Sequence, residues 1–458
     1  MSKVMTLMNE LIELISMGPF GSDIKVDNFI SDGVPVLNGS NVSSIKLIET
    51  SFKYVSPEKA KALKKANAKR GDIVITHRGT VGQISYIPED SMYDNYVISQ
   101  SQFRVSLKRD LVDPIYFTYY FHTDEGQKRL LSFKSHVGVP ALAQATTNFR
   151  LLEFPLIPLI EQKKIAKVLS DLDSKIELNI RINSELEAMA KMLYDYWFVQ
   201  FDFPDANGKP YKTAGGKMVW NAELKREIPE GWEVKLYAEW INNDKSGDWG
   251  KEQPEGNYTE KVYCIRGADI NGLNGTGQLK SPERYILEKN LHKTLDPADL
   301  VVEISGGSPT QSTGRLAFIT EGTLTRFDAP IICSNFCKAV TLKNKKLLYN
   351  FVYHWKSIYD AGVLFGYEGK TSGIKNLLFD SFVCSHFTVV PEESIANKFY
   401  DFMEPIQTQK QKNLKENQEL ASLRDWLLPM LMNGQVSVGD VEEELGMVAE
   451  GREEYKKE

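Results

Sequence analysis

Two heptad-patterned segments lie 234 residues apart in this chain, each following a stretch of about domain size, and their seam positions correspond. In both, apolar residues and asparagines occupy the alternating three- and four-residue spacing of a coiled coil. The first seam comprises Ile165, Leu169, Leu172, Ile176, Asn179, Asn183, Leu186, Ala190, Leu193 and Trp197. The second comprises Phe399, Met403, Ile406, Lys410, Asn413, Asn417, Leu420, Arg424, Leu427 and Leu431. The chain is therefore a tandem repeat in which each half ends in a long helix.

The asparagine layers indicate that the two helices pair with each other. A buried asparagine costs stability but fixes the register and the choice of partner. Antiparallel pairing sets Asn179 opposite Asn417 and Asn183 opposite Asn413. A parallel pair would also align these residues, as the constant offset shows, and two unpaired core helices are a third interpretation. We predict the antiparallel pair, because it relates the halves by a near two-fold axis.

Two cations and an aromatic run need partners in this arrangement. Lys410 and Arg424 fall at seam positions, so each must reach water or pair with an acid, and Glu185 and Glu187 are near enough to be candidate partners. The first helix is expected to end in aromatic residues between Tyr194 and Phe203. We expect these aromatic side chains to be exposed, which would favour a protein-binding surface at this end of the helix.

Composition fits two globular domains and their helices. A chain of 458 residues is too long for one core, and its 42% hydrophobic and 25% charged residues are ordinary for globular proteins. It has no run of eighteen apolar residues and no secretory leader, so we expect a cytoplasmic protein. The four cysteines lack zinc-ligand spacing, so we expect no metal site and reduced, buried thiols.

The net charge of −6 is unevenly distributed. Residues 436–458 hold eight acidic and three basic residues, whereas residues 1–150 hold eighteen basic and fifteen acidic ones. A dense basic cluster lies at Lys59, Lys61, Lys64, Lys65, Lys69 and Arg70. It could form a basic face for a polyanion, or merely the solvated side of a helix over residues 57–68.

The predicted fold is α+β: two loop-rich, mixed α/β domains and two long helices that form an antiparallel coiled coil, in a pseudo-two-fold tandem repeat. Short β-rich runs separated by Gly, Asn, Ser and Pro predict the mixed domains. Residues 1–15 read as a helix-like stretch instead. The boundaries are 1–157 for domain 1, 158–204 for the first helix, 205–227 for a turn-rich connector, 228–390 for domain 2, 391–435 for the second helix and 436–458 for an acidic, mobile tail.

Four strings carry a resemblance to a known family, and their order and spacing make it specific. They are Pro158-Leu-Ile-Glu-Gln-Lys-Lys-Ile-Ala, Trp197-Phe-Val-Gln-Phe-Asp-Phe, Ile228-Pro-Glu-Gly-Trp-Glu-Val and Leu423-Arg-Asp-Trp-Leu-Leu-Pro. Over residues 1 to about 435 the chain resembles the DNA-specificity (S) subunits of type I restriction-modification enzymes. The N-terminal opening departs from the family, since its usual tryptophan and Leu-Gly-Asp turn are absent.

The resemblance implies a division of labour. Two target-recognition domains would each read half of a split double-stranded DNA site, while the helices bind two methyltransferase subunits and, through the complex, the restriction subunits. The chain itself would be non-catalytic and hold no cofactor, because S-adenosylmethionine, ATP and magnesium would belong to its partners.

Candidate DNA-binding residues lie in or beside turns. Arginine suits guanine and asparagine or glutamine suits adenine, while lysines suit phosphates. In domain 1 the candidates are Asn38, Asn41, Lys69, Arg70, His77, Arg78, Thr80, Gln83, Gln144 and Asn148, with Lys64, Lys65 and Lys134 also suited to phosphates. In domain 2 they are Arg266, Asn271, Ser308, Gln311, Arg315, Lys370, Thr371 and Lys375. Polar turn residues also commonly serve only the backbone, so we single out Arg78 and Arg315.

Two other functions stay open. Asp205 with Glu223-Leu-Lys225 loosely resembles a metal-dependent nuclease core, which would make the chain a self-contained endonuclease. A coiled-coil adaptor without DNA affinity is the other alternative. No P-loop, adenine-methyltransferase motif, HExxH or GxSxG string is present.

Overall fold

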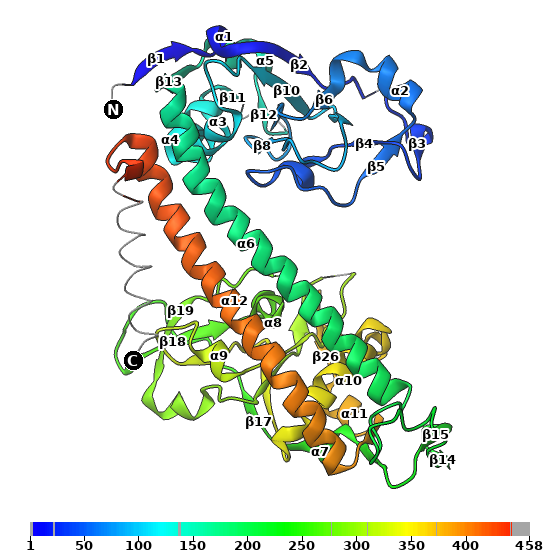
Figure 1. Ribbon diagram of the computed structural model, residues 1–458. Coiled ribbons are helices and arrows are strands. Elements are labelled where there is room, and N and C mark those ends of the chain that lie inside the picture. Colours follow the sequence, from blue (N-terminus) through cyan, green and yellow to red (C-terminus); the bar gives the residue numbers. More distant parts are fainter. Residues whose placement is uncertain are drawn as a thin grey trace. The chain divides into compact units, whose positions relative to one another are not determined.

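The computed structural model describes residues 3–21, 23–135, 139–275, 277–308, 310–371, 373–439 and 441, apart from the side chains of residues 370 and 371. The chain divides into two compact units, one comprising Met1–Ser174 with Leu420–Glu458, and the other Lys175–Glu419. We call these unit 1 and unit 2. Each unit contains part of both long helices, α6 (Leu159–Tyr194) and α12 (Glu393–Asn433) (Figure 1).

Unit 1 is built from short strands and helices that precede α6. Its strands are β1 (Val4–Leu7), β2 (Ile12–Met17), β3 (Phe29–Ile30), β4 (Val34–Val36), β5 (Lys53–Val55), β6 (Asn67–Lys69), β7 (Ile73–Thr76), β8 (Ile84–Tyr86), β9 (Asn95–Val97), β10 (Gln102–Leu107), β11 (Lys134–Ser135), β12 (Ala141–Leu142) and β13 (Glu153–Leu156). Its short helices are α1 (Met8–Leu11), α2 (Pro57–Ala62), α3 (Pro114–Phe121), α4 (Asp124–Leu130) and α5 (Ala145–Leu151).

Unit 2 has the corresponding elements between α6 and α12. Its strands are β14 (Met218–Asn221), β15 (Arg226–Pro229), β16 (Glu233–Leu236), β17 (Ile241–Ser246), β18 (Tyr258–Ile265), β19 (Glu283–Leu287), β20 (Leu300–Glu303), β21 (Ser305–Gly306), β22 (Leu316–Phe318), β23 (Ile331–Cys333), β24 (Cys337–Leu342), β25 (Glu368–Thr371), β26 (Ile374–Leu377) and β27 (Phe387–Val390). Its short helices are α7 (Tyr237–Trp240), α8 (Ile270–Asn274), α9 (Glu321–Leu324), α10 (Leu348–Asp360) and α11 (Phe379–Val383).

The same antiparallel sheet occurs in both units. Its strand order is β2-β10-β7-β8 in unit 1 and β17-β24-β20-β22 in unit 2. In each unit a strand and a single helical turn, β1 and α1 or β16 and α7, precede the edge strand of this sheet. That first strand pairs with the last strand before a long helix, β1 with β13 and β16 with β27. The tandem repeat is therefore confirmed at the level of topology.

The second sheets differ between the units. Unit 1 has a five-stranded sheet, β3-β5-β4-β9-β6, over its own small core around Val42, Val55 and Tyr96. Unit 2 has a three-stranded sheet, β19-β18-β23, and an extra small sheet, β21-β26-β25. The repeats thus share a framework and differ in the elements attached to it.

The long helices pair antiparallel in the predicted register. In unit 2, Asn179 Nδ2 donates to Asn417 Oδ1 at 2.9 Å and Asn413 Nδ2 donates to Asn183 Oδ1 at 2.8 Å. At the same end of the pairing, the rings of Trp197 and Phe399 lie 5.7 Å apart. The antiparallel coiled coil is confirmed.

The unit 1 part of the seam is apolar. Ile165, Leu169, Leu427 and Leu431 are buried in one core, and Leu172 packs against it. Other predicted seam residues are half-buried: Ile176, Leu186, Leu193, Ile406, Asn417 and Leu420. Phe399 and Met403 are fully buried in unit 2.

Several local expectations were wrong. Of residues 3–15, only Met8–Leu11 (α1) are helical. They are flanked by β1 and β2, because β1 finds a partner in β13 that local sequence does not reveal. The helix expected over residues 57–68 stops at Ala62, since Asn67 and the residues after it pair with β9. The connector contains the start of a β14–β15 hairpin.

The aromatic end of α6 is buried rather than exposed. A π-helical turn, Asp195–Val199, follows α6, and Trp197, Phe198, Phe201 and Phe203 belong to the core of unit 2. Only Tyr196 in this run is exposed, at 37%. These rings stabilise unit 2 and do not offer the open protein-binding surface that we expected.

The remaining expectations concern cysteines, tail and membrane. Cys264, Cys333 and Cys337 are buried and free, whereas Cys384 is exposed. Val438 and Val441 are buried in unit 1, and residues 440 and 442–458 of the expected tail lie outside the described residues. Where the chain is described, no helix is long and apolar enough to span a bilayer, and no cluster of three metal-ligating side chains occurs.

Candidate nucleic-acid interface

A basic cleft in unit 1 collects several predicted residues from separate loops. Its volume is about 1340 Å³, and its walls include Lys64 and Lys65 after α2, His77 and Arg78 after β7, and Phe20 after β2. Arg78 is exposed, and within the described residues no acid pairs with its guanidinium. Lys64 and Lys65 are also exposed. These cations are therefore free to meet an anionic ligand.

Backbone contacts hold the arginine loop in place. His77 N donates to Ser101 O at 2.9 Å, Gly79 N donates to Pro140 O at 3.0 Å, and His77 Nε2 lies 3.1 Å from Gln100 O. Burial lowers the pKa of His77, and the neighbouring Arg78 lowers it further, while the contact with Gln100 opposes the shift. The ring is therefore neutral near pH 7 and can position Arg78 without adding charge.

An exposed phenylalanine at the rim of the cleft was missed in the sequence. Phe20 is 82% exposed, although its backbone is fixed: its N–H donates to Asp23 Oδ2 at 2.9 Å and its carbonyl accepts from Asp23 N at 2.8 Å. A Cβ at Gly18 would lie 1.9 Å from Ser99 O, so only glycine lets this loop approach its neighbour. The Gly18-Pro-Phe-Gly string, which is typical of a turn, could have indicated in the sequence that Phe20 is exposed.

The other unit 1 candidates divide into three groups. Asn38, Thr80 and Gln83 lie around Gly39, where Thr80 Oγ1 donates to Gln83 Oε1 at 2.5 Å. Gln144 is exposed, and Asn148 donates to Ala143 O at 2.7 Å at the start of α5. Lys69 and Arg70 line a separate hollow of about 280 Å³ and do not join the cleft.

Asn41 belongs to the framework. It is fully buried, its Nδ2 donates to Ile48 O at 2.8 Å and Thr50 O at 2.9 Å, and its Oδ1 accepts from Asn38 N at 2.9 Å. Both amide protons and one acceptor position of its side chain are thus used within the loop. Asn41 supports the loop, and a direct DNA contact by this residue stays a prediction.

Three candidate cations of unit 2, those whose side chains are described, are already paired with acids. Arg315 donates two hydrogen bonds to Glu303, at 2.8 and 2.7 Å, and Arg266 donates to Asp269 at 2.8 Å. Lys375 lies 3.1 Å from Glu368. A bidentate pair in this half-buried setting is costly to break, so Arg315 holds its loop rather than offering a free guanidinium. A DNA contact by Arg315 stays a prediction, and it would require this ion pair to open.

The remaining unit 2 candidates are scattered. Ser308 Oγ accepts from Gln311 N at 3.1 Å, and Gln311 is exposed and accepts from Lys375 through its carbonyl. Asn271 is exposed and lines a hollow beside the helix seam. The side chains of Lys370 and Thr371 lie outside the described residues.

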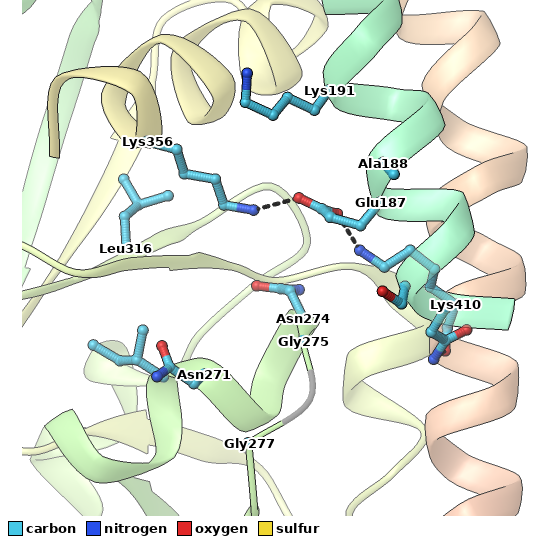
Figure 2. A pocket seen from close by; sticks show the side chains of 13 residues that line it. Glu187, Ala188, Lys191, Asn271, Asn274, Gly275, Gly277, Leu316, Lys356 and Lys410 are labelled. Carbon is cyan, nitrogen blue, oxygen red and sulfur yellow. Dashed lines mark hydrogen bonds and ion pairs between the residues drawn. The ribbon is translucent and has the colours of Figure 1, made fainter. Parts of the chain in front are cut away.

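The seam cation of unit 2 is neutralised by the predicted acid. Lys410 is 1% exposed and forms an ion pair with Glu187, which also contacts Lys356 at 2.9 Å (Figure 2). Burial raises the pKa of Glu187, but Lys356 and Lys410 outweigh it and hold that pKa at about 2. Burial lowers the pKa of Lys410 despite Glu187. Glu187 is thus held in its ionised form by two lysines, whereas burial disfavours the charged form of Lys410.

The seam cation of unit 1, Arg424, is also paired with an acid. Arg424 Nη1 donates to Asp173 at 2.6 Å, and the Tyr119 hydroxyl donates to the same carboxylate. Sequence spacing had placed this cation in the seam but had not identified Asp173 as its partner. Partners on neighbouring helices become visible only in the folded chain.

Comparison with known proteins agrees with this architecture. Residues 24–188 match the family model of the type I restriction modification DNA specificity domain. The chain is similar to the type I restriction enzyme MjaIX specificity subunit of Methanocaldococcus jannaschii, with 24% identity over 380 residues that cover 81% of this chain and 79% of the relative. It is also similar to the HindI specificity subunit of Haemophilus influenzae, with 23% identity over 442 residues covering 88% and 94%.

One solved structure supports the fold. The crystal structure of a type I restriction-modification S subunit from M. genitalium aligns with a TM-score of 0.55 and 15% identity, covering 94% of this chain and 96% of that one. At this identity the likeness concerns the fold alone.

Proposed function

We propose, on the premise that this chain belongs to the DNA-specificity subunits of type I restriction-modification enzymes, that each of its two sheet-rich units reads one half of a bipartite DNA site. The subunit itself is a non-catalytic component of the complex. The proposal includes assembly of α6 and α12 with two methyltransferase subunits and, through them, with restriction subunits. It also places this complex in the cytoplasm.

The repeated sheet carries the proposal. The orders β2-β10-β7-β8 and β17-β24-β20-β22 set the β7–β8 loop of unit 1 and the β20–β22 loop of unit 2 at the same position in each framework. The first loop bears Arg78, and the second bears Ser308 and Gln311. Two similar frameworks with different loops are what the reading of two different half-sites requires.

Charge supports an interaction with DNA in unit 1. The cleft offers Lys64 and Lys65 for phosphates and the free Arg78 for a base edge, with guanine as its favoured partner. Among the unit 2 candidates whose side chains are described, the cations Arg266, Arg315 and Lys375 are paired with acids, and the others are neutral. We propose that reading by unit 2 depends more on loop amides and hydroxyls, and that phosphate attraction comes chiefly from unit 1.

A long seam can connect two readers. α6 has 36 residues, and at about 1.5 Å per residue it extends roughly 54 Å, more than one DNA turn of about 34 Å. The asparagine register then fixes which parts of the two helices face each other. We propose that this register sets the gap between the half-sites.

Methylation mapping tests the proposal directly. The chain is expressed with its methyltransferase subunits, and modified adenines are located across the genome of the host. We expect one bipartite motif with a fixed gap. Absence of any motif that depends on this chain would overturn the proposal and favour the adaptor.

Salt dependence tests the assigned cleft. With the assembled complex, Lys65→Ala should reduce the slope of log K against log salt by about one unit and leave the motif unchanged. Lys293→Ala, a half-buried unit 2 lysine that contacts Gly247 O, is the matched control. An unchanged slope for Lys65→Ala would remove this cleft from the interface.

A further inference from the structure

Three packed aromatic residues of unit 1 have smaller polar counterparts in unit 2. Tyr116, Tyr120 and Phe154 are buried, and the Phe154 ring lies 6.1 Å from Tyr116 and 5.1 Å from Tyr120. The offset of 234 that relates the long helices leads to Asn350, His354 and Thr388. The elements agree with this offset, since α3 and α10 begin at Pro114 and Leu348, and β13 and β27 begin at Glu153 and Phe387.

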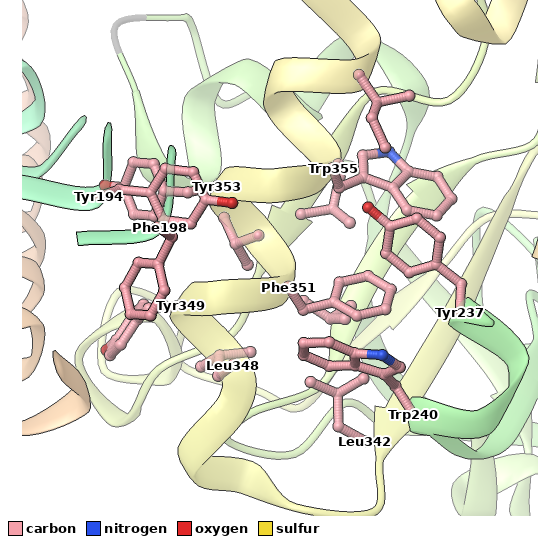
Figure 3. Packing of buried hydrophobic residues seen from close by; sticks show 14 of the residues in the cluster. Tyr194, Phe198, Tyr237, Trp240, Leu342, Leu348, Tyr349, Phe351, Tyr353 and Trp355 are labelled. Carbon is pink, nitrogen blue, oxygen red and sulfur yellow. The ribbon is translucent and has the colours of Figure 1, made fainter. Parts of the chain in front are cut away.

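These three polar residues line a cavity within unit 2. Its volume is about 510 Å³, and Tyr194, Phe198, Trp232 and Trp240 form its aromatic walls. Figure 3 shows Tyr194 and Phe198 on one side of α10 and Trp240 on the other, within the surrounding core. Protein cores are ordinarily close-packed, as unit 1 is at this position, so the cavity is a specific feature of the second repeat.

Polar atoms of the cavity lining lack partners. Asn350 is 3% exposed, and within the described part of the chain neither its Nδ2 nor its Oδ1 makes a hydrogen bond. The same holds for Trp240 Nε1. Buried polar groups in native proteins are normally paired, so an unpaired donor, and an amide with both atoms free, indicate a place for a complementary molecule.

His354 adds a neutral polar ring. Its Nδ1 lies 2.5 Å from the Tyr237 hydroxyl oxygen and 3.0 Å from the Thr388 hydroxyl oxygen, so both hydroxyls hold the ring in place. Burial lowers the pKa of His354 to about 4, so the ring is neutral at pH 7. The imidazole therefore adds polarity to the cavity without adding a positive charge.

One cation of the lining is not neutralised. The guanidinium of Arg226 lies 4.6 Å from the Phe201 ring centre and donates to Val199 O at 3.3 Å, and no acid pairs with it among the described residues. Asp195, which also lines the cavity, is already paired with Lys191 at 2.6 Å. The lining thus has capacity for one negative charge.

The wall formed by α6 is irregular at this point. The cavity is lined by Tyr194, Phe198, Val199 and Gln200, at the π-helical turn that ends α6. Single π-helical turns often occur at functional sites. This observation is independent of the unpaired atoms.

We propose that the cavity binds a small, planar, heteroaromatic monocarboxylate. Its ring would lie between the aromatic walls, its carboxylate would pair with Arg226, and its polar edge would meet the Asn350 amide and the Trp240 N–H. A phosphate dianion fits less well, because the lining offers one uncompensated cation. The proposal does not depend on DNA binding.

Calorimetry and thermal unfolding of the full-length chain test the proposal, with nicotinate and indole-2-carboxylate as probes. Both should bind with 1:1 stoichiometry and raise Tm with concentration. Nicotinamide, which keeps the ring but lacks the charge, and AMP should bind at least about tenfold more weakly. If neither carboxylate binds the wild-type chain, the cavity is only a packing feature and the proposal is wrong.

Variants identify the binding groups. Arg226→Met should weaken nicotinate binding by about tenfold or more, whereas Asn335→Leu, an exposed residue elsewhere in unit 2, should not. Filling the cavity with the unit 1 residues, as Asn350→Tyr, His354→Tyr and Thr388→Phe together, should abolish binding. Binding that persists in this filled chain would overturn the assignment. If the triple variant does not fold, Asn350→Leu decides in its place, and unchanged affinity would count against the site.

Discussion

Asn413 donates its side-chain amide to Asn183 Oδ1 at 2.8 Å, although the two residues are 230 positions apart. Both side chains are almost completely buried in the seam of α6 and α12. Because this hydrogen bond forms only when the two positions face each other, it favours this register over a shifted one.

The asparagine pair should contribute more to the register of α6 and α12 than to the stability of the folded chain. Asn413→Leu leaves the buried Asn183 carbonyl without this donor and should lower the free energy of unfolding by about 1–3 kcal/mol. Asn183→Leu with Asn413→Leu should recover most of that loss. Urea unfolding measures both, with Lys412→Leu on the exposed side of α12 as control. A single substitution as stable as wild type would show that the bond contributes little.

The seam ion pair should respond asymmetrically to substitution. Glu187→Gln leaves the buried Lys410 ammonium without its acid and should destabilise unit 2 by about 3–5 kcal/mol. Lys410→Met removes the buried charge while Glu187 keeps Lys356, so its effect should be small. The double variant should lie near wild type in a thermodynamic cycle. Equal losses from both single variants would contradict this account.

Acid should weaken unit 2 through Glu187. Because the pKa of Glu187 is lowered to about 2, its contribution is complete above the unfolded value of about 4.3 and is lost as pH falls toward 2. We expect a loss of about 2 kcal/mol, allowing for partial solvent screening. Unfolding by urea at pH 6, 4 and 3 measures it. Glu187→Gln should show a flatter profile over the same range, and an identical slope would exclude Glu187 as the cause.

Substitutions of Arg78 and Arg315 should have different effects, one on DNA binding and the other on stability. Arg78→Ala should weaken DNA binding by the assembled complex, by about 1–3 kcal/mol, and leave thermal stability unchanged because its side chain is exposed. Arg315→Ala leaves Glu303 buried without its cation, so it should lower the Tm. Gel shifts at stated salt, together with calorimetry, separate these effects. A stability loss in Arg78→Ala alone would reverse the assignment.

Phe20 should contribute to binding through its ring. Phe20→Ala should reduce the affinity of the complex for its site several-fold, since an exposed aromatic side chain beside cations can contact bases or sugars. Phe336, a 52% exposed aromatic of unit 2, provides the control substitution Phe336→Ala. Comparable affinity of Phe20→Ala and wild type would leave Phe20 without a role in the interface.

Much of the architecture followed from periodicity. Seven-residue spacing identified both helices and their asparagine layers, because a seam position depends only on local geometry. The pairing of Asn179 with Asn417 also needed the choice of an antiparallel arrangement, which the structure confirms. The strand over Ile73–Thr76 was also recognisable, since its four residues are all β-branched and the segment is bounded by turns. The helix-like reading of residues 1–15 was wrong, because β1 is a strand only through its pairing with β13.

Sequence alone determined that the chain is a repeat, that each half ends in a heptad-patterned helix, and that Lys410 falls at a seam position. Tertiary structure decided which polar side chains are free. Arg78 and Arg315 look alike in sequence, yet one is exposed and the other is bound by Glu303, twelve residues away and on an adjacent strand. It also decided that Asn350, His354 and Thr388 share one cavity, because distant segments meet only when the chain folds.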